Sequence, residues 1–291
     1  MSTVIFALPG NEAVASKIAT TLDASLGDFT IRQFPDGETY IRILSDVAGK
    51  KVIMVCTLDN PDSKLLPLYF LSRTAKELGA DCTCLVAPYL AYMRQDKQFN
   101  PGEAVTSTFF ARLISGFADT LITVDPHLHR RHSMDEIYSI PCKVLHAAGL
   151  VSQWIRENIQ QPVLIGPDSE SEQWVSAVAR DAGAPFIVLE KERHGDRDVK
   201  VSVPKVEIYK EHTPVLVDDI ISTARTMIET VGHLKKAGMK PPVCIGVHGI
   251  FARHAFEDLK NAGAGTIVTT NTIFHSSNAI EVGELLASEL K

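Results

Sequence analysis

Short apolar runs alternate with segments of helical periodicity along the whole chain. The runs Cys82–Ala87, Val163–Gly166 and Val243–Val247 are typical of strands buried on both faces of a sheet. Between such runs, apolar residues recur three or four positions apart, as in Glu12–Leu22 and Glu172–Ala182, and this spacing predicts amphipathic helices. Strands that alternate with helices favour an α/β fold of mainly parallel sheets flanked by helices.

The same criteria predict the remaining elements. The further strands that we expect are Val4–Leu8, Thr30–Gln33, Tyr40–Ile43, Lys51–Cys56, Thr120–Val124, Phe186–Leu189, Pro214–Asp219 and Gly265–Thr269. The further helices that we expect are Ser63–Leu78, Glu103–Ile114, Leu145–Asn158, Met227–Ala237, Ala252–Ala262 and Ile280–Leu290.

A weak internal repeat divides the chain into two halves. The strand–helix–strand unit at 52–87 is echoed in order and spacing at 215–247. We therefore expect two similar α/β domains, residues 1–143 and residues 144–291, with the last helix able to pack back on the first domain. Ligands of such sheets bind at the carboxyl ends of the strands.

Composition narrows the class of protein. Of the 291 residues, 45% are hydrophobic and 22% are charged, and the net charge is −6, so we expect a globular protein with no general attraction to nucleic acid or membranes. The five cysteines form no CxxC pair, which argues against a disulfide framework or a zinc site. The first ten residues lack the basic region of a signal peptide, and we expect a cytoplasmic protein.

The stretch Val215–Met227 carries the clearest candidate chemistry. A buried strand is followed by Asp218 and Asp219, then by small and hydroxyl residues, and then by a helix. Backbone N–H groups and the helix dipole form an anion site at such a junction, and the acids can accept hydrogen bonds from sugar hydroxyls. A sugar phosphate fits this pattern. The alternative is an ordinary turn with an N-cap, where Asp, Ser and Thr are common.

Charged side chains after other predicted strands could act on phosphates. Lys191 and Arg193 open a charged segment that could close over a polyphosphate and neutralise developing charge, although a solvated turn would look the same. His127 and Asp168 each follow a strand and suit Mg²⁺ that is held mainly by phosphates and waters. A lone histidine is more often structural, and we assign no role to the nearby cluster of His129, Arg130, Arg131 and His132.

Two loops in the first half could hold a nucleotide. Arg94 could bind a phosphate through two guanidinium N–H groups, and the adjacent Gln95 could read a base edge. Phe34, with Asp36 and Glu38, could stack on adenine and hydrogen-bond to it. Each segment could also have a purely structural role. The segment of Arg94 and Gln95 would then be a loop before a helix, and the segment of Phe34 would be a hairpin turn.

Taken in order, these segments resemble ribose-phosphate diphosphokinases (phosphoribosyl diphosphate synthetases) over essentially the full chain. Six motifs in family order are far beyond chance. They are the adenine element Phe34–Glu38, the ATP motif ending in Arg94, Gln95, Asp96 and Lys97, the metal-binding element Val124–His127, the pyrophosphate-loop start Gly166–Asp168, the flexible-loop pair Lys191 and Arg193, and the ribose-5-phosphate loop Asp218–Thr226.

The resemblance implies transfer of the diphosphoryl group of MgATP to the 1-hydroxyl of ribose 5-phosphate. It implies that Lys191 and Arg193 are catalytic and that His127 and Asp168 bind Mg²⁺. ATP would contact Phe34, Asp36, Glu38, Arg94, Gln95 and Asp96. Ribose 5-phosphate would contact Asp218, Asp219, Ser222, Thr223, Ala224, Arg225 and Thr226. Because the adenine element of this family usually reaches a neighbouring subunit, a homo-oligomer with shared sites is also implied.

Some positions depart from the family pattern. Ser169–Glu172 stands where glycines usually follow the metal-linked aspartate, and Ser222 stands where many members have aspartate. Ala224 and Arg225 also replace glycines, and close approach of a ligand to Ala224 requires a negative φ there. Two other hypotheses therefore stay open: a non-catalytic paralogue that regulates an active synthetase, and a phosphoribosyltransferase, which shares the Asp218–Thr226 type of loop.

Overall fold

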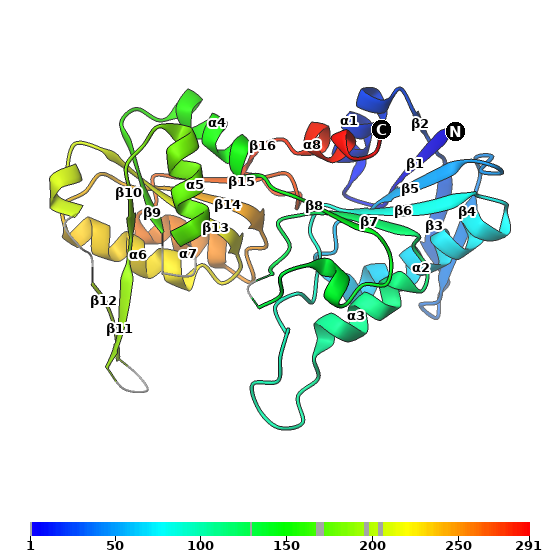
Figure 1. Ribbon diagram of the computed structural model, residues 1–291, viewed down its shortest axis with the longest axis horizontal. Helices are drawn as coiled ribbons and strands as arrows, with labels where there is room; N and C mark the ends of the chain where they lie inside the picture. Colours follow the sequence, from blue (N-terminus) through cyan, green and yellow to red (C-terminus); the bar gives the residue numbers. More distant parts are fainter. Residues whose placement is uncertain (1, 129, 167–171, 195–197, 203–205) are drawn as a thin grey trace. The chain divides into compact units, whose positions relative to one another are not determined.

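The protein is described here from a computed structural model. The structure describes residues 2–128, 130–166, 172–194, 198–202 and 206–291, with side chains except at 173, 190–194, 198–202 and 207. The chain forms two compact units (Figure 1). The first holds Met1–Leu145, Thr272–Phe274 and Val282–Lys291, and the second holds His146–Asn271 and His275–Glu281.

A six-stranded parallel sheet forms the first unit, in the order β2-β1-β5-β6-β7-β8. Its strands are β1 (Thr3–Ala7), β2 (Ser25–Leu26), β5 (Lys51–Val55), β6 (Cys82–Ala87), β7 (Thr120–Val124) and β8 (Cys142–Leu145). Helices α1 (Glu12–Leu22) and α8 (Gly283–Ser288) lie on one face, and α2 (Pro61–Glu77) and α3 (Thr106–Ser115) lie on the other (Figure 1). An antiparallel hairpin of β3 (Phe29–Gln33) and β4 (Thr39–Ile43) packs on α2.

The second unit repeats this design with the order β10-β9-β13-β14-β15-β16, again all parallel. Its strands are β9 (Pro162–Gly166), β10 (Phe186–Val188), β13 (Thr213–Ile221), β14 (Val243–Gly249), β15 (Thr266–Thr270) and β16 (Asn278–Ile280). Its helices are α4 (Ala148–Asn158), α5 (Glu172–Ala182), α6 (Arg225–Lys236) and α7 (Ala255–Ala262). The predicted fold class, two similar α/β domains with mainly parallel sheets, is confirmed.

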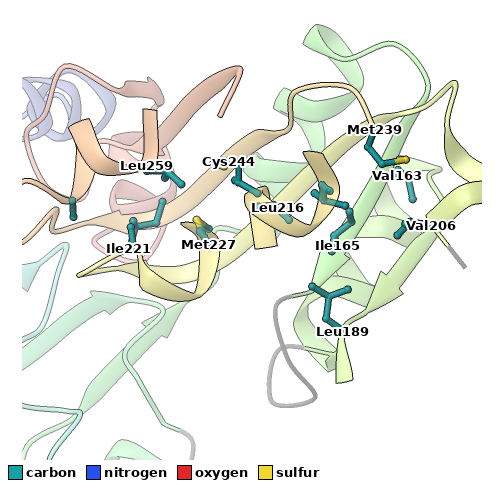
Figure 2. Close-up of a cluster of buried hydrophobic side chains, with 14 of the residues drawn as sticks. Val163, Ile165, Leu189, Val206, Leu216, Ile221, Met227, Met239, Cys244 and Leu259 are labelled. Atoms are coloured by element: carbon teal, nitrogen blue, oxygen red, sulfur yellow. The ribbon is translucent and has the colours of Figure 1, made fainter. Parts of the chain in front are cut away.

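Alternating side chains of β13 supply the cores on the two faces of the second sheet. Leu216 belongs to the cluster under α6 and α7 (Figure 2), whereas Val215 and Val217 belong to the cluster under α4 and α5. All three are at most 1% exposed. Because successive strand residues point to opposite faces, a continuous apolar run is what a strand covered on both sides requires.

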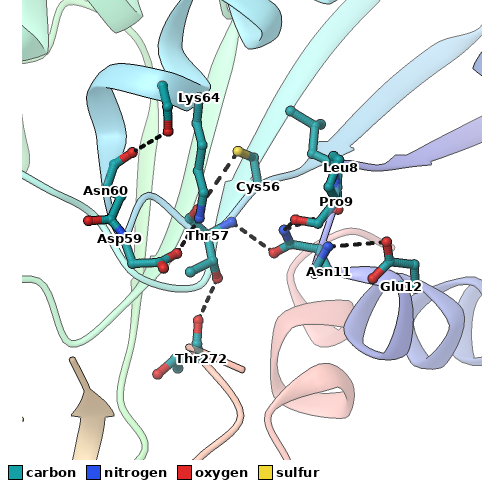
Figure 3. Close-up of polar contacts among 12 residues, drawn as sticks. Leu8, Pro9, Asn11, Glu12, Cys56, Thr57, Asp59, Asn60, Lys64 and Thr272 are labelled. Atoms are coloured by element: carbon teal, nitrogen blue, oxygen red, sulfur yellow. Dashed lines mark hydrogen bonds and ion pairs between the residues drawn. The ribbon is translucent and has the colours of Figure 1, made fainter. Parts of the chain in front are cut away.

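A buried polar network explains why Thr272–Phe274 belongs to the first unit (Figure 3). The Thr57 hydroxyl donates to the Thr272 carbonyl, and the Thr57 N–H donates to the Asn11 side-chain oxygen at 2.8 Å. Lys64 donates to the Thr57 carbonyl at 2.9 Å. Since Asn11, Thr57 and Thr272 are buried, each polar atom needs such a partner. The C-terminal end is held similarly, by a bond from Lys51 Nζ to the Leu290 carbonyl at 3.1 Å.

Several predicted boundaries were wrong. The helix expected from Leu145 begins at Ala148, because Cys142–Leu145 is the edge strand β8. The helix expected from Ile280 is preceded by β16 and spans only Gly283–Ser288. Both strands are four residues or shorter, and such strands are too short to show a periodic pattern of apolar residues. The charged segment after Leu189 is not a plain turn, since β11 (Glu190–His194) pairs antiparallel with β12 (Asp198–Ser202).

Candidate functional site

The two acids of the candidate sugar-phosphate loop lie near the carboxyl end of β13. Strand β13 pairs with β9 only as far as Leu216 opposite Ile165, whereas on its other side Asp218 lies opposite Gly246 of β14. Asp218 and Asp219 are half-buried, and the Asp219 N–H donates to Asp218 Oδ1 at 3.0 Å. The strand was predicted to end at Asp219 but continues to Ile221.

Two buried side chains fix the ends of the loop that follows. Ile221, at the end of β13, and Met227, in the first turn of α6, are 1% and 2% exposed and belong to one hydrophobic cluster (Figure 2). Between them, Thr223 and Arg225 are exposed, while Ser222 and Thr226 are half-buried. The first N–H groups of an α-helix have no intrahelical acceptor, so the start of α6 offers donors beside these hydroxyls. This geometry suits a phosphate.

Ala224 has a positive φ, whereas close approach of a ligand was expected to require a negative φ at this residue. Its φ is +56° and its ψ is +7°, in the left-handed region, where a Cβ atom costs about 1–2 kcal/mol. The residue is only 7% exposed and belongs to the same cluster as Ile221 and Met227. The turn into α6 therefore requires the backbone that glycine adopts easily, and the alanine methyl group packs into the core. The condition of a negative φ at this position is not met.

In the first unit, His127 follows β7. Strand β7 ends at Val124, and Asp125 turns the chain with a φ of +36° while its N–H donates to the Leu145 carbonyl at 2.9 Å. His127 is half-buried. Its predicted metal partner Asp168 lies outside the described residues. Within the described part of the chain, no group of three or more His, Cys, Asp or Glu side chains could hold a metal ion. A single histidine fits only a cation held mostly by phosphates and water, as Mg²⁺ commonly is.

The loop with the predicted ATP residues is organised by its own acids. The Asp96 side chain is 2% exposed and its two carboxylate oxygens accept from Arg130 Nη1 at 3.0 and 3.3 Å. Gln95 donates to the Lys97 carbonyl at 3.2 Å and to Glu103 at 3.4 Å. Arg94 is exposed. Of the three predicted residues, Arg94 thus presents its side chain to solvent, while Gln95 and Asp96 hold the loop.

Glu103 closes this loop and does not begin a helix as predicted. Its carboxylate accepts from the Phe99 N–H at 2.7 Å, the Asn100 N–H at 3.0 Å and the Asn100 side chain at 2.7 Å. These bonds, led by the one from the Asn100 side chain, lower the pKa of the Glu103 carboxyl group. Helix α3 starts three residues later, at Thr106. The carboxylate stabilises the loop because its hydrogen bonds are charge-assisted and hold three donors at one point.

The basic cluster after β7, to which sequence reasoning gave no role, joins two candidate loops. Arg130 pairs with Asp96, as described above. Arg131 Nη2 lies 3.4 Å from the Asp96 carbonyl and 3.3 Å from each of the Ser107 and Thr108 hydroxyls. The loop of His127 and the loop of Arg94 are therefore one connected structure at the carboxyl ends of β6 and β7. The sequence did contain a signal for this contact: an Asp and two Arg residues, which can form ion pairs, stand on two separate predicted loops.

Phe34, Asp36 and Glu38 occupy the tip of the β3–β4 hairpin. The Phe34 N–H donates to the Glu38 carbonyl at 2.8 Å, and the Glu38 N–H donates to Asp36 Oδ1 at 3.2 Å. Phe34 is 40% exposed, and the Arg32 guanidinium lies 4.7 Å from its ring centroid. A cavity of about 560 Å³ beside the hairpin is lined by Phe34 and by residues of β4 and α2. The aromatic ring is thus contacted by Arg32 and Tyr40 and remains partly exposed.

The predicted catalytic pair lies on the β11–β12 ribbon. Lys191 is opposite Val201 and Arg193 is opposite Val199 in its antiparallel register. The side chains of Lys191 and Arg193 lie outside the described atoms. Their catalytic role stays a prediction.

Two family models match the chain. One, described as the N-terminal domain of ribose phosphate pyrophosphokinase, matches residues 3–117. The other, described as a phosphoribosyl transferase domain, matches residues 133–284. Together they cover both units of the fold.

Full-length relatives carry a consistent name. The ribose-phosphate pyrophosphokinase of Methanothermobacter thermautotrophicus is 30% identical over 99% of this chain and 100% of its own length. That of Methanosarcina acetivorans is 32% identical over 97% of each chain. The crystal structure of phosphoribosylpyrophosphate synthetase from Mycobacterium smegmatis matches with a TM-score of 0.84 at 24% identity, covering 100% of this chain and 98% of that one, and shows the same fold.

Proposed function

Because the chain belongs to the ribose-phosphate pyrophosphokinase family, we propose that it transfers the diphosphoryl group of ATP to the 1-hydroxyl of ribose 5-phosphate. The products are phosphoribosyl diphosphate and AMP. The observation that carries the proposal is the full-length similarity to enzymes of this name. The loop that joins the carboxyl end of β13 to the N-terminus of α6 is consistent with it, because such a junction suits an anion.

Ribose 5-phosphate binds at the loop between β13 and α6. Its 5-phosphate accepts from the N–H groups at the start of α6 and from the hydroxyls of Ser222, Thr223 and Thr226. Asp218 and Asp219, half-buried just before this loop, accept hydrogen bonds from the 2- and 3-hydroxyls. The exposed Arg225 adds positive charge beside the phosphate. The backbone of Ala224 provides the turn that aims the helix N-terminus at the ligand.

ATP binds through residues of the first unit. Phe34 stacks on adenine, while Asp36 and Glu38 offer acceptors to its amino group. Arg94 binds phosphate oxygens, and Gln95 and Asp96 act by holding the Arg94 loop. Support for this division comes from the exposure of Phe34 and Arg94 and from the pairing of the buried Asp96 side chain with Arg130.

The reaction needs positioning and charge neutralisation more than covalent catalysis. The 1-hydroxyl oxygen attacks the β-phosphorus in line, and the bond to the α-phosphate oxygen breaks to release AMP. Lys191 and Arg193 neutralise charge on the transferring group. Mg²⁺, held by His127 and Asp168 with phosphates and water, would neutralise charge on the phosphate oxygens.

The proposed partners follow from the proposed reaction and from the proposed site for adenine. ATP and ribose 5-phosphate are the substrates, and we propose a homo-oligomer in which the Phe34 hairpin contributes to a neighbouring site. No helix within the described residues is long and apolar enough to cross a membrane. The expectations of no nucleic-acid partner and of a cytoplasmic location stay predictions from composition.

A coupled assay tests the activity and the assigned catalytic residue together. The wild-type protein should form AMP from ATP only when ribose 5-phosphate and Mg²⁺ are both present. Lys191→Ala should lower kcat by at least about 100-fold, as expected for removal of a group that stabilises transition-state charge. Lys260→Ala removes a lysine from the exposed side of α7 and serves as the matched control. An undiminished kcat in Lys191→Ala would refute the role of this lysine.

The same assay separates the proposal from its rivals. A regulatory paralogue would form no AMP alone but would bind an active synthetase. A phosphoribosyltransferase would consume phosphoribosyl diphosphate and a base without needing ATP. The match of residues 3–117 to a pyrophosphokinase N-terminal domain gives no support to the latter.

A further inference from the structure

The loop that follows β14 contacts the proposed ribose-5-phosphate loop through its backbone. The N–H groups of Ile250 and Phe251 both donate to the Ile221 carbonyl at 3.0 Å, and the Ala252 N–H donates to the Ser222 carbonyl at 3.0 Å. These carbonyls belong to the last residue of β13 and to the first residue of the phosphate-binding loop. The turn at 250–252 therefore fixes the point where that loop leaves the sheet.

This turn has an unusual backbone. Phe251 has a φ of +45° and Arg253 has a φ of +60°. A bulky residue in this region costs about 1–3 kcal/mol and persists only where the surroundings enforce it. Phe251 is 8% exposed, so the packing of its side chain can supply that enforcement.

The ring of Phe251 is enclosed by specific neighbours. Its centroid lies 4.6 Å from that of His275 and 5.2 Å from that of Phe256. A Cβ atom on Gly249 would approach the ring to 2.7 Å and Thr269 Cγ2 to 2.8 Å, so only glycine leaves room for the ring over the end of β14. Glycine inside a strand commonly marks such a close approach.

His275 is itself fixed by hydrogen bonds. The Ser277 N–H donates to His275 Nδ1 at 3.1 Å, and the Ser277 hydroxyl lies 2.8 Å from the Thr269 hydroxyl of β15. A continuous set of contacts thus runs from β15 through His275 to the Phe251 ring, and from the Phe251 backbone to the phosphate-binding loop. Phe251 lies outside all six motifs of the sequence.

We propose that Phe251 is a positioning residue for ribose 5-phosphate: its ring, seated over Gly249 and against His275, sets the 250–252 turn that holds the Ile221 and Ser222 carbonyls and thereby aims the phosphate-binding N–H groups. Phe251 does not touch the substrate. The inference rests on the proposed function, because it requires that this loop bind the 5-phosphate.

Steady-state kinetics of the full chain test the role. Phe251→Ala should raise KM for ribose 5-phosphate about tenfold, because small displacements of positioning groups weaken productive binding. KM for ATP should change less than about twofold, because the ATP contacts proposed above lie in the other unit. Gly249→Ala should act in the same direction by displacing the ring. Phe251→Leu keeps an apolar side chain and gives a milder variant, expected to shift KM the same way, in case the alanine variant fails to fold.

Leu259→Ala is the matched control. Leu259 is fully buried in the same cluster as Phe251 but lies on α7 and makes none of the turn contacts. It should lower the melting temperature while leaving KM for ribose 5-phosphate unchanged. If Phe251→Ala and Gly249→Ala lower the melting temperature and also leave this KM at the wild-type value, Phe251 only packs the core and the proposal is wrong.

Failure of the proposed function would give a different experimental result from failure of the proposal for Phe251. Wild-type protein that forms no AMP would count against the activity. Calorimetric titration with ribose 5-phosphate then tests positioning directly, with weaker binding by Phe251→Ala than by wild type expected. Absence of binding by the wild type would overturn both proposals.

Discussion

At the scale of single residues, a positive φ at a residue other than glycine occurs both in the candidate ribose-5-phosphate loop and in the 250–252 turn that contacts it. Ala224 and Phe251 both adopt this conformation, and both belong to the cluster that anchors Ile221 and Met227. Left-handed backbone at such residues persists only when the surrounding packing enforces it. Their coincidence beside one loop is the pattern expected where backbone geometry serves a ligand.

The conformation of Ala224 predicts which substitutions it tolerates. Ala224→Gly should change the free energy of unfolding by less than about 1 kcal/mol, since relief of the left-handed strain offsets lost burial and added chain entropy. Ala224→Val should destabilise by about 2 kcal/mol or more, because a β-branched residue is a genuine outlier at positive φ. Urea unfolding measures both.

Ala237→Val provides the control for valine itself. Ala237 packs against the same cluster at a φ of −76°. If valine at 224 is tolerated as well as valine at 237, the left-handed turn does not constrain this loop.

His275 gives a second prediction at this scale, on pH. Burial lowers the pKa of His275 below its usual value, with Glu257 acting in the opposite direction. A histidine whose pKa is lower in the folded state binds fewer protons folded than unfolded. Stability should therefore fall as pH drops through the unfolded pKa of about 6.5, until the folded pKa is passed.

Urea midpoints at pH 7.5 and pH 5 check this dependence. His275→Gln should reduce the loss of stability between these two conditions relative to wild type. The control is Asn261→Gln, at an exposed side chain of the same unit that carries no titratable group, which should leave the loss unchanged. Equal pH dependence in wild type and His275→Gln would contradict the assignment.

At the scale of elements, the loop between β6 and α3 is built on charged side chains. Glu103 closes it through the N–H groups of Phe99 and Asn100, and Arg130 closes it through the buried Asp96. The first part of the loop is buried, with Leu90 and Met93 only 3% and 2% exposed, whereas Phe99 in the second part is 55% exposed. The conformation of the part that follows Arg94 therefore depends on hydrogen bonds to carboxylates.

Loss of the Glu103 charge should weaken ATP binding without loss of the fold. Glu103→Gln makes weaker bonds to the same N–H groups, and we expect KM for ATP to rise severalfold while KM for ribose 5-phosphate stays constant. Glu157→Gln, at an exposed position near the end of α4 in the second unit, is the control. Equal effects on both substrates would show that the loop does not act on ATP specifically.

At the scale of the whole molecule, large apolar side chains remain exposed on two helices of the first unit. Leu66 and Phe109 are each 58% exposed on α2 and α3, and Tyr69, Phe70 and Leu113 are 37–44% exposed. The Ser72 hydroxyl on α2 donates to the carbonyl of Phe117, two residues past the end of α3, and this bond joins α2 to the segment that follows α3. Clustered exposed apolar residues mark interaction surfaces, and this supports the proposed homo-oligomer.

Charge on this surface should dissociate the oligomer. We expect the double variant Leu66→Lys, Phe109→Lys to show a lower mass by light scattering than wild type, because burying two ammonium groups opposes association. Ile208→Lys, at a 70% exposed apolar residue of the second unit, should keep the wild-type mass. An unchanged mass in the double variant would show that the interface does not include Leu66 and Phe109.

The sequence by itself determined the elements with a clear period and the place of His127. Helices Glu12–Leu22 and Glu172–Ala182 were predicted with their observed bounds, because amphipathic helices of three turns carry the 3.6-residue period in full. His127 was expected after a strand and lies there, whereas Asp218 and Asp219, which were expected at the end of a strand, lie two residues or more before the end of β13.

Tertiary structure alone decided what those residues contact. The pairing of Asp96 with Arg130, the closure of the loop by Glu103 and the support of Ser222 by the Phe251 turn join segments distant in sequence or lacking any period. Such contacts depend on which strands are neighbours in the sheet and on the space that a glycine without a Cβ leaves for another side chain. The sequence of a short segment specifies neither. The left-handed backbone of Ala224 has the same origin, since the core around it selects a conformation that its own preference disfavours.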